Sequence, residues 1–175
     1  SESTLTTETN ISWRPAVKTR TFWLLAVTSG ISNLATSGIT VLVIPHLENV
    51  GIRPATAALA ITFITLVSVA GRLGGGWLGD HFDKRHILAL GLILQALGAL
   101  TLAKVDAAWM IIPFVLLYAP GYGATIPIRP AIAAEAFGRT SFGSIQGLLQ
   151  GVMTLLSVPG PLVGGLVFDL TGSYS

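Results

Sequence analysis

The stretch that decides the fold is GRLGGGWLGDHFDKRH, residues Gly71–His86, which ends in a dense group of charged side chains. The run 55–70 before it carries no charge, and no further charge appears after it until Lys104. Charges gathered into short segments between long apolar runs are typical of a chain whose helices cross a bilayer and whose loops lie in water.

The composition leads to the same fold class. The chain has 175 residues, of which 51% are hydrophobic and 10% charged, and its mean hydropathy is +0.73. Soluble domains carry about 25% charged residues. A bilayer admits only helices or closed barrels, and the apolar runs lack the period-two alternation of barrel strands. We therefore predict an all-α membrane protein. A net charge of only +2, with the basic residues spread over loops, argues against a nucleic-acid partner.

The apolar runs predict five transmembrane helices, at about residues 22–45, 55–79, 87–103, 108–134 and 142–168. Each is long enough to cross a hydrocarbon core of about 30 Å. The polar segment 1–20 is predicted to be a cytoplasmic linker. The chain begins at a serine and stops soon after the fifth run, so we expect a piece of a longer protein. Residues 21–175 are expected to form part of a six-helix bundle.

The basic residues predict the orientation of these spans, because cytoplasmic loops are rich in Lys and Arg. With the N-terminus inside, the cytoplasmic segments hold Arg14, Lys18, Arg20, Lys84, Arg85 and Arg139. The outer loops then hold only Arg53 and Lys104. We expect a multi-pass protein of the cell membrane, the inner membrane in a bacterium, with a cytoplasmic N-terminus.

Polar side chains recur at steps of three and four residues in four of these spans, which places each set on one helix face. The sets are Ser29, Asn33, Ser37 and Thr40; Thr62, Thr65, Ser68 and Arg72; Tyr118, Tyr122, Thr125 and Arg129; and Gln146, Gln150, Thr154 and Ser157. Because polar groups are costly against lipid, we expect these four helices to line an aqueous cavity. The span 87–103, with only Gln95 in its interior, is expected to be an outer scaffold. The alternative is that the stripes merely hydrogen-bond between packed helices.

Two arginines lie at membrane depth. Arg72 stands eight residues before Asp80, about 12 Å along a helix, and Arg129 stands ten residues before Arg139. An intramembrane arginine is a functional hypothesis by default. No acidic residue of this chain lies at comparable depth, so the counter-anion is either a carboxylate elsewhere in the protein or the substrate, and a guanidinium suits a carboxylate. Arg72 could instead snorkel or cap a helix end. For Arg129, gating or pairing with Glu135 is favoured over substrate contact.

Glycines and prolines add expectations about packing. The glycines of the opening stretch, and the four-residue steps of Gly143, Gly147 and Gly151, predict close approach of helices. Residues 74–79 match the dinucleotide pattern G-x-G-x-x-G, but they follow a membrane helix rather than a strand, so no nucleotide is expected. Three prolines, at 120, 127 and 130, predict that the fourth span is broken or kinked, and Pro161 predicts a bend in the fifth.

Gly76–Arg85 resembles the signature G-x-L-a-D-R-x-G-R-R of the major facilitator superfamily, with matches at Gly76 and Asp80 and at the basic pair Lys84 and Arg85. His81 stands where a cation is usual. Asp83 stands where glycine is usual, and we expect this to change the turn because Asp tolerates positive φ less well.

Two further segments support this resemblance. Gly160-Pro161-x-x-Gly164-Gly165 is similar to the element in the fifth helix of a half, and Glu135–Arg139 is similar to the residues that end the fourth.

The resemblance extends to one half of the family's twelve-helix fold. The segments 19–23, 127–130 and 168–174 look like the C-terminal half of the monocarboxylate and oxalate/formate branch. The resemblance implies that this chain holds helices seven to eleven of a twelve-helix transporter, and that the N-terminal half is a missing partner. It also implies that the third helix is peripheral and that the others line the central cavity.

These observations predict secondary active or facilitated transport of a small organic anion, such as a monocarboxylate, by alternating access. The candidate substrate-binding residues are Arg72, Asn33, Tyr118, Tyr122, Arg129 and Gln150. The candidate gating residues, expected to form a cytoplasmic charge cluster, are Gly76, Asp80, Lys84, Arg85, Glu135 and Arg139. The alternatives are a truncated module that does not transport and a carrier of another solute such as a drug or sugar. We expect no enzyme, metal or cofactor, because no catalytic constellation or metal-ligand spacing is present.

Overall fold

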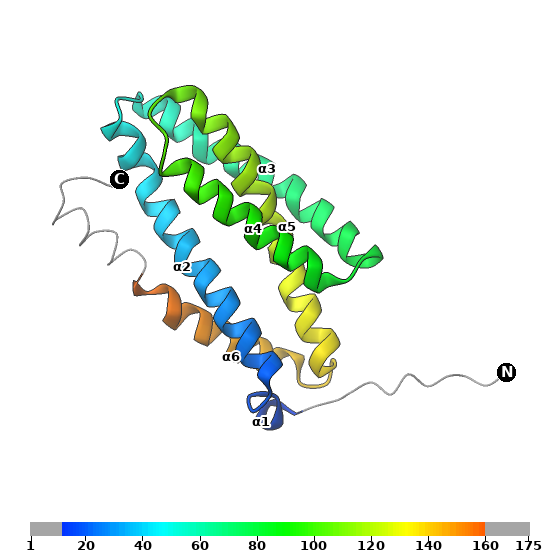
Figure 1. Ribbon diagram of the computed structural model, residues 1–175. Coiled ribbons are helices and arrows are strands. Elements are labelled where there is room, and N and C mark those ends of the chain that lie inside the picture. Colours follow the sequence, from blue (N-terminus) through cyan, green and yellow to red (C-terminus); the bar gives the residue numbers. More distant parts are fainter. Residues whose placement is uncertain (1–11, 160–175) are drawn as a thin grey trace.

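The computed structural model describes residues 12–159, and these residues form a bundle of helices (Figure 1). The elements are α1 Trp13–Ala16, α2 Arg20–Asn49, α3 Pro54–His81, α4 Lys84–Leu102, the short 3-10 turn η1 Ala108–Met110, α5 Ile111–Phe137 and α6 Phe142–Ser157. The long helices α2 to α5 overlap the first four predicted spans, and α6 begins where the fifth was predicted. The rest of that span, with Pro161 and the segment 160–165, lies outside the described residues.

Local sequence signals explain where several helices begin and end. The Thr19 hydroxyl accepts a hydrogen bond from the Phe22 amide at 3.2 Å and caps α2. Pro54 occupies the first turn of α3, where its missing N–H costs nothing. At the end of α5, Gly138 adopts a φ of 78°, a conformation that only glycine adopts without strain.

The most extensive packing joins α5 to α4 and to α3, while α2 packs mainly against α6 (Figure 1). Small residues make the contacts of α5 possible. A Cβ atom on Gly75 of α3 would lie 2.6 Å from the Cα of Ala124, and one on Gly98 of α4 would lie 2.6 Å from the Tyr118 Cβ. The prediction of close packing is thus confirmed for Gly75. Its neighbours Gly74 and Gly76 face open space in the described part of the chain.

The structure limits one prediction about proline and leaves one about glycine untested. Although Pro120, Pro127 and Pro130 lie inside it, α5 is one continuous α-helix, so it is not broken, and the predicted kink stays a prediction. Membrane helices tolerate proline where neighbouring helices and local adjustments satisfy the freed carbonyls, and α5 lies between two neighbours. The Gly143–Gly147–Gly151 face of α6 meets no other described atom within 4 Å of where a Cβ would lie.

The interior has an apolar cluster at each end and polar groups between. At the end where α3 meets α4, the cluster includes Phe22, Ile132 and Phe137. At the opposite end, where α2 meets α3, it includes Leu47 and Phe114. The buried polar side chains of the middle are Ser29, Ser32, Ser68, Gln95 and Thr125. A polar centre sealed by apolar ends positions any site deep within the bundle.

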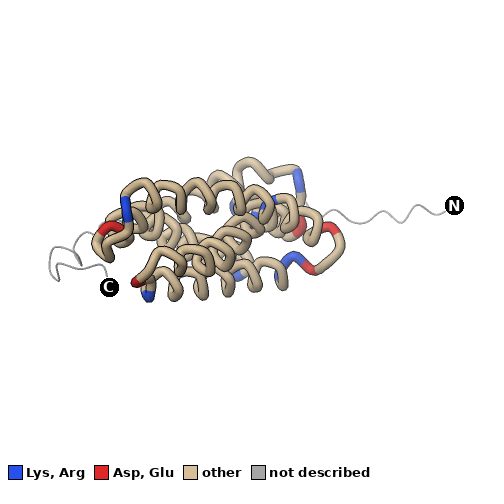
Figure 2. Tube along the Cα trace, turned by 90° about the horizontal axis from the view of Figure 1, so that it is seen from above, with Lys and Arg blue, Asp and Glu red and all other residues tan. Residues whose placement is uncertain are grey.

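The outside of the bundle fits a bilayer. Large apolar side chains point outward on every long helix, and Leu73 and Leu155 are each 74% exposed. Four helical segments have the length and hydropathy of a membrane span, namely Arg20–Val41, Pro54–His81, Lys84–Leu102 and Ala108–Phe137. The charged residues lie mostly at the two ends of the bundle (Figure 2). The chain is therefore an all-α, multi-pass membrane protein.

Candidate functional site

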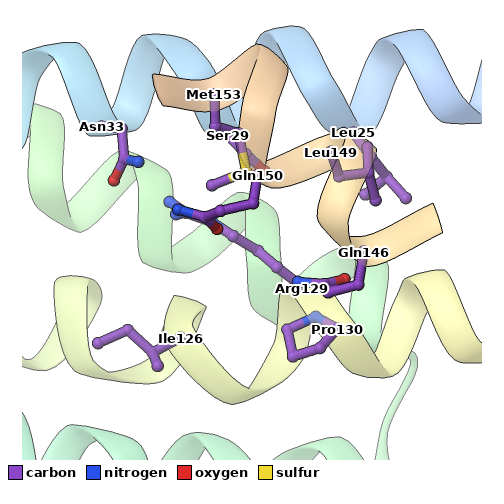
Figure 3. Close-up of a pocket in the computed structure, with 10 residues that line it drawn as sticks. All are labelled: Leu25, Ser29, Asn33, Ile126, Arg129, Pro130, Gln146, Leu149, Gln150 and Met153. Carbon is purple, nitrogen blue, oxygen red and sulfur yellow. The ribbon is translucent and has the colours of Figure 1, made fainter. Parts of the chain in front are cut away.

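A cavity of about 290 Å³ opens between α2, α5 and α6, and we call it the arginine cavity (Figure 3). Its lining residues are Leu25, Ser29, Asn33, Ile126, Arg129, Pro130, Gln146, Leu149, Gln150 and Met153. The apolar members form walls, while Asn33, Arg129 and Gln150 project into the space (Figure 3). A small number of polar groups in an apolar cavity is the usual composition of a small-molecule site.

Arg129 is half-buried and is held from one side. Its Nη2 donates a hydrogen bond to the Ser32 hydroxyl at 2.6 Å, whereas its Nε is buried without a hydrogen-bond partner in the described structure. The favoured pairing with Glu135 is wrong, because the Glu135 carboxylate pairs with Lys84 at 2.5 Å and has no ion pair with Arg129. The guanidinium thus keeps donors that no described protein group uses.

The rest of the cavity is electrically neutral. Its other polar side chains are the hydroxyl of Ser29 and the amides of Asn33, Gln146 and Gln150, and the Gln146 Oε1 is also buried without a partner. No carboxylate lines this cavity among residues 12–159, nor do these residues group three or more potential metal ligands. A cation beside neutral amide donors suits an anionic guest, above all a planar carboxylate.

A second cavity, of about 220 Å³, lies between α2, α3 and α5, and we call it the tyrosine cavity. Tyr118 and Tyr122 stack on one wall with ring centroids 6.0 Å apart and planes 9° apart. The Tyr118 hydroxyl donates to the Thr36 hydroxyl at 3.1 Å, which ties α5 to α2. Arg72 lines the same cavity from α3, and its side chain is exposed.

The predicted substrate residues therefore fall into two groups. Asn33, Arg129 and Gln150 line the arginine cavity, and Arg72, Tyr118 and Tyr122 line the tyrosine cavity. Sequence reasoning missed Ser32, the protein partner of Arg129. The sequence did contain a signal for Ser32, because Ser29, Ser32 and Thr36 recur at helical spacing just as the set with Asn33 does.

The outer helix α4 also contributes to the polar centre. Gln95 is 6% exposed and contacts α2 and α5 through its side-chain amide. The expectation that α4 is only a scaffold is thus wrong at this position. A lone polar side chain in an apolar membrane helix needs an internal partner, and this was the signal that pointed to it.

Most hydroxyls of the polar stripes bond to their own helix. The hydroxyls of Thr40, Thr65, Ser68 and Thr154 each donate to a carbonyl three or four residues earlier. This local bonding satisfies a hydroxyl without a partner helix. The alternative of bonding between helices holds only for a few groups of the described chain, chiefly Ser32, Thr36, Gln95 and Thr125.

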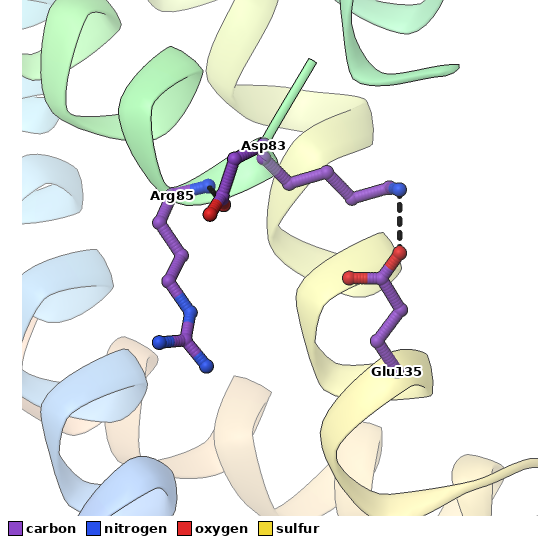
Figure 4. Close-up of polar contacts among 4 residues, drawn as sticks. Asp83, Arg85 and Glu135 are labelled. Atoms are coloured by element: carbon purple, nitrogen blue, oxygen red, sulfur yellow. Dashed lines mark hydrogen bonds and ion pairs between the residues drawn. The ribbon is translucent and has the colours of Figure 1, made fainter. Parts of the chain in front are cut away.

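The predicted gating residues lie near the ends of α3 and α5 and at the start of α4, and they are only partly joined. Lys84 at the start of α4 pairs with Glu135 near the end of α5, which is the only ion pair within the described range. Asp80, Arg85 and Arg139 are exposed, and Gly76 faces open space. The Arg85 guanidinium points away from the Asp83 carboxylate (Figure 4).

Comparison with known families decides what these features belong to. The family model of the Major Facilitator Superfamily matches residues 22–175. This chain is a member of the major facilitator superfamily. The fold predicted from the signature at Gly76–Arg85 is thereby confirmed.

Within the superfamily, the chain is similar to two kinds of protein. It is 26% identical to monocarboxylate transporter 12 of Rattus norvegicus over 158 residues, which cover 88% of this chain and 32% of the relative. It is 32% identical to the class E tetracycline resistance protein of Escherichia coli over 99 residues, 57% of this chain and 24% of the relative. The chain thus spans about a third or less of these relatives, and the predicted resemblance to the monocarboxylate branch is confirmed.

The structure also explains how this member of the superfamily accommodates the two departures in its signature. Asp83 has a φ of −61°, so the turn before α4 needs no positive φ at this position. That it differs from the turn of relatives with glycine here stays a prediction. The Asp83 carboxylate accepts a hydrogen bond from the Arg85 amide at 2.8 Å and caps α4. His81 stacks on Trp77, and its Nδ1 lies 2.8 Å from that residue's carbonyl oxygen. Both departures are therefore satisfied locally.

Proposed function

We propose that this chain is the C-terminal part of a secondary transporter that moves a small organic anion, such as a monocarboxylate, by alternating access. The observation that carries the proposal is Arg129, a guanidinium deep in the bundle with an unpartnered Nε and no carboxylate in its described cavity. A buried charge without a counter-ion is costly, so a bound anion would stabilise this arrangement. The proposal places residues 1–20 on the cytoplasmic side.

The relatives support two substrate classes. Monocarboxylate transporter 12 and monocarboxylate transporter 13 of Rattus norvegicus carry the first in their names. The tetracycline resistance protein favours a drug as the second candidate, and the stacked Tyr118 and Tyr122 rings offer an apolar face to an aromatic molecule. The size of the arginine cavity and its single cation favour the small anion.

Uptake into proteoliposomes, with the full gene product, tests the proposal and the role of Arg72. We expect saturable uptake of lactate, pyruvate, formate or oxalate, with no comparable uptake of tetracycline or glucose. Arg72→Gln is expected to abolish anion uptake while leaving membrane insertion intact, because it removes the cation of the tyrosine cavity. Normal uptake by that variant would remove Arg72 from the site, and uptake of tetracycline alone would favour the second candidate.

We further propose that the gating residues form a cytoplasmic latch with the other half of the transporter. Lys84 and Glu135 already pair within this chain, with 21% and 60% of their side chains exposed. Asp80, Arg85 and Arg139 are exposed at the same end and are available to groups of the other half. Exposed ion pairs contribute only about 0.2–1 kcal/mol each, which suits a contact that must break in every cycle.

The latch predicts a shift in accessibility when Asp80 is neutralised. Asp80→Asn is expected to favour the inward-open state, because one charge of the cytoplasmic contact is lost. These 175 residues hold no cysteine. In a full gene product from which any other cysteine has been removed, a Ser29→Cys change in the arginine cavity can report access to a membrane-impermeant thiol reagent from each side. Asp106→Asn, at an exposed position of the opposite end, is the matched control. Identical labelling of the Asp80→Asn variant and its parent would rule out the latch.

A further inference from the structure

A chain of buried hydrogen bonds runs from Arg129 across three helices. The Arg129 Nη2 donates to the Ser32 hydroxyl at 2.6 Å, and that hydroxyl donates to the Gln95 Oε1 at 2.9 Å. The Gln95 Nε2 donates to the Thr125 hydroxyl at 3.3 Å, which donates to the Tyr122 carbonyl at 2.9 Å. The chain passes from α5 to α2, then to α4, and back to α5.

The directions of the bonds in this chain follow from its donor at one end, Arg129. An arginine has only donors, so the Ser32 oxygen must accept from it, and the single Ser32 proton is left for another acceptor. That acceptor is the Gln95 carbonyl, which forces the amide nitrogen of Gln95 toward Thr125. The chain therefore begins at a cation and ends at a backbone carbonyl, and the roles of its members agree with one another.

The burial of these groups makes the arrangement stringent. Ser32 and Gln95 are each 6% exposed and Thr125 is 1% exposed. A buried polar group without a hydrogen-bond partner is destabilising, because it has lost its water and gained no other partner. Breaking any bond of this network would therefore be unfavourable. No described side chain besides Gln95 accepts the Ser32 proton.

We infer that Gln95, on the outer helix α4, is a positioning residue that holds Arg129 in its anion-binding orientation through Ser32. Because the Gln95 Oε1 accepts the hydrogen bond of the Ser32 hydroxyl, the lone pairs of the Ser32 oxygen stay turned toward the guanidinium. One corner of the guanidinium is thereby fixed, while the Nε remains free of protein partners. The inference rests on the proposed function for the identity of the anion, but the coupling of Gln95 to Arg129 does not.

The charged groups around Gln95 are few. The titratable side chains that α5 places on this network are Arg129 and Tyr118, and α2 presents only the hydroxyls of Thr28, Ser32 and Thr36. Lys84, Arg85 and His86, the titratable groups of α4, lie in its first turn. Gln95→Glu would thus put a carboxylate one hydroxyl away from the guanidinium, where it competes with a bound anion.

The first test is a double-mutant cycle of transport, measured as lactate uptake by the full gene product in proteoliposomes. Gln95→Met, which keeps the side-chain volume, is expected to raise the KM about tenfold with the maximum rate within about twofold of the parent. Gln95→Glu is expected to raise the KM at least as much. In a Ser32→Ala background, Gln95→Met should add little, because the link to Arg129 is already broken. The matched control is Thr101→Val, which removes a hydroxyl of α4 that bonds only to its own helix.

A second readout needs no substrate. Thermal unfolding of the purified parent, Gln95→Met, Arg129→Met and the double variant forms a cycle between two residues with no hydrogen bond to each other among the described ones. We expect clear non-additivity in the melting temperatures. Additive shifts, or KM effects of Gln95→Met that persist fully without the Ser32 hydroxyl, would overturn the inference. Absence of uptake of any monocarboxylate by the parent would instead overturn the proposed function, and the thermal cycle would still decide the role of Gln95.

Discussion

Arg129→Gln is expected to raise the KM for monocarboxylate uptake about 100-fold, the equivalent of about 3 kcal/mol for losing a buried charge partner. The physical reason is that Arg129 is the cation of the arginine cavity and its Nε has no partner in the described structure. Glutamine is polar but carries no charge, and it is two bonds too short to replace the Nη2 bond to Ser32. The effect should therefore fall on anion binding rather than on folding.

Two further variants sharpen this measurement. Arg129→Lys keeps the positive charge but lacks the planar fork that can hold Ser32 and an anion together, so an intermediate rise of about tenfold is expected. Arg53→Gln removes an exposed arginine at the start of α3 and should leave the KM unchanged. If Arg129→Gln bound and carried lactate like the parent, the anion would have to be held elsewhere, and the tyrosine cavity with Arg72 would become the leading candidate.

The sequence predicts individual helices better than it predicts their neighbours. Hydropathy and charge suffice for the helices, since each one must satisfy its own backbone in the bilayer. Helical periodicity likewise places Asn33, Arg129 and Gln150 on polar faces, and the structure gathers them around one cavity. Periodicity does not say which helix lies opposite, however. The prediction therefore placed in one site residues that the structure divides between two cavities.

The wrong assignments share this cause. Pairing of Arg129 with Glu135 was plausible because both lie on one helix. However, α4 packs against α5, and Lys84 of α4 pairs with Glu135 in place of Arg129. The role of Gln95 was missed because its helix is otherwise apolar. In both cases the deciding contact joins residues that lie far apart in the sequence, and a single sequence carries no record of such pairing.

Gly75→Ala is expected to be among the most damaging single-methyl changes in the opening stretch of sequence. A Cβ at this position would lie 2.6 Å from the Cα and 2.8 Å from the Cβ of Ala124, which belong to a packed helix rather than to a flexible side chain. The two helices must separate to relieve the clash, and overpacking of this kind costs typically about 1–3 kcal/mol. Gly75→Leu should prevent the assembly of α3 with α5 altogether.

Two other glycines of this stretch, Gly74 and Gly79, provide the controls. Gly74 faces open space in the described chain, so Gly74→Ala should leave the stability unchanged or slightly raised, since alanine is the better helix former. Gly79→Ala should fall between these limits, because its Cβ would meet only the Cδ1 of Ile128, the movable end of a side chain, at 2.6 Å.

Thermal unfolding of the full gene product in detergent, followed by tryptophan fluorescence, measures this series. The expected order of melting temperatures is Gly74→Ala at or above the parent, then Gly79→Ala, then Gly75→Ala. Equal melting temperatures for Gly74→Ala and Gly75→Ala would show that the α3–α5 contact does not limit stability. The expected order would instead mean that the glycines once compared with a nucleotide-binding loop act as a contact surface between helices, which holds Arg72 at the tyrosine cavity and Asp80 at the end of the bundle.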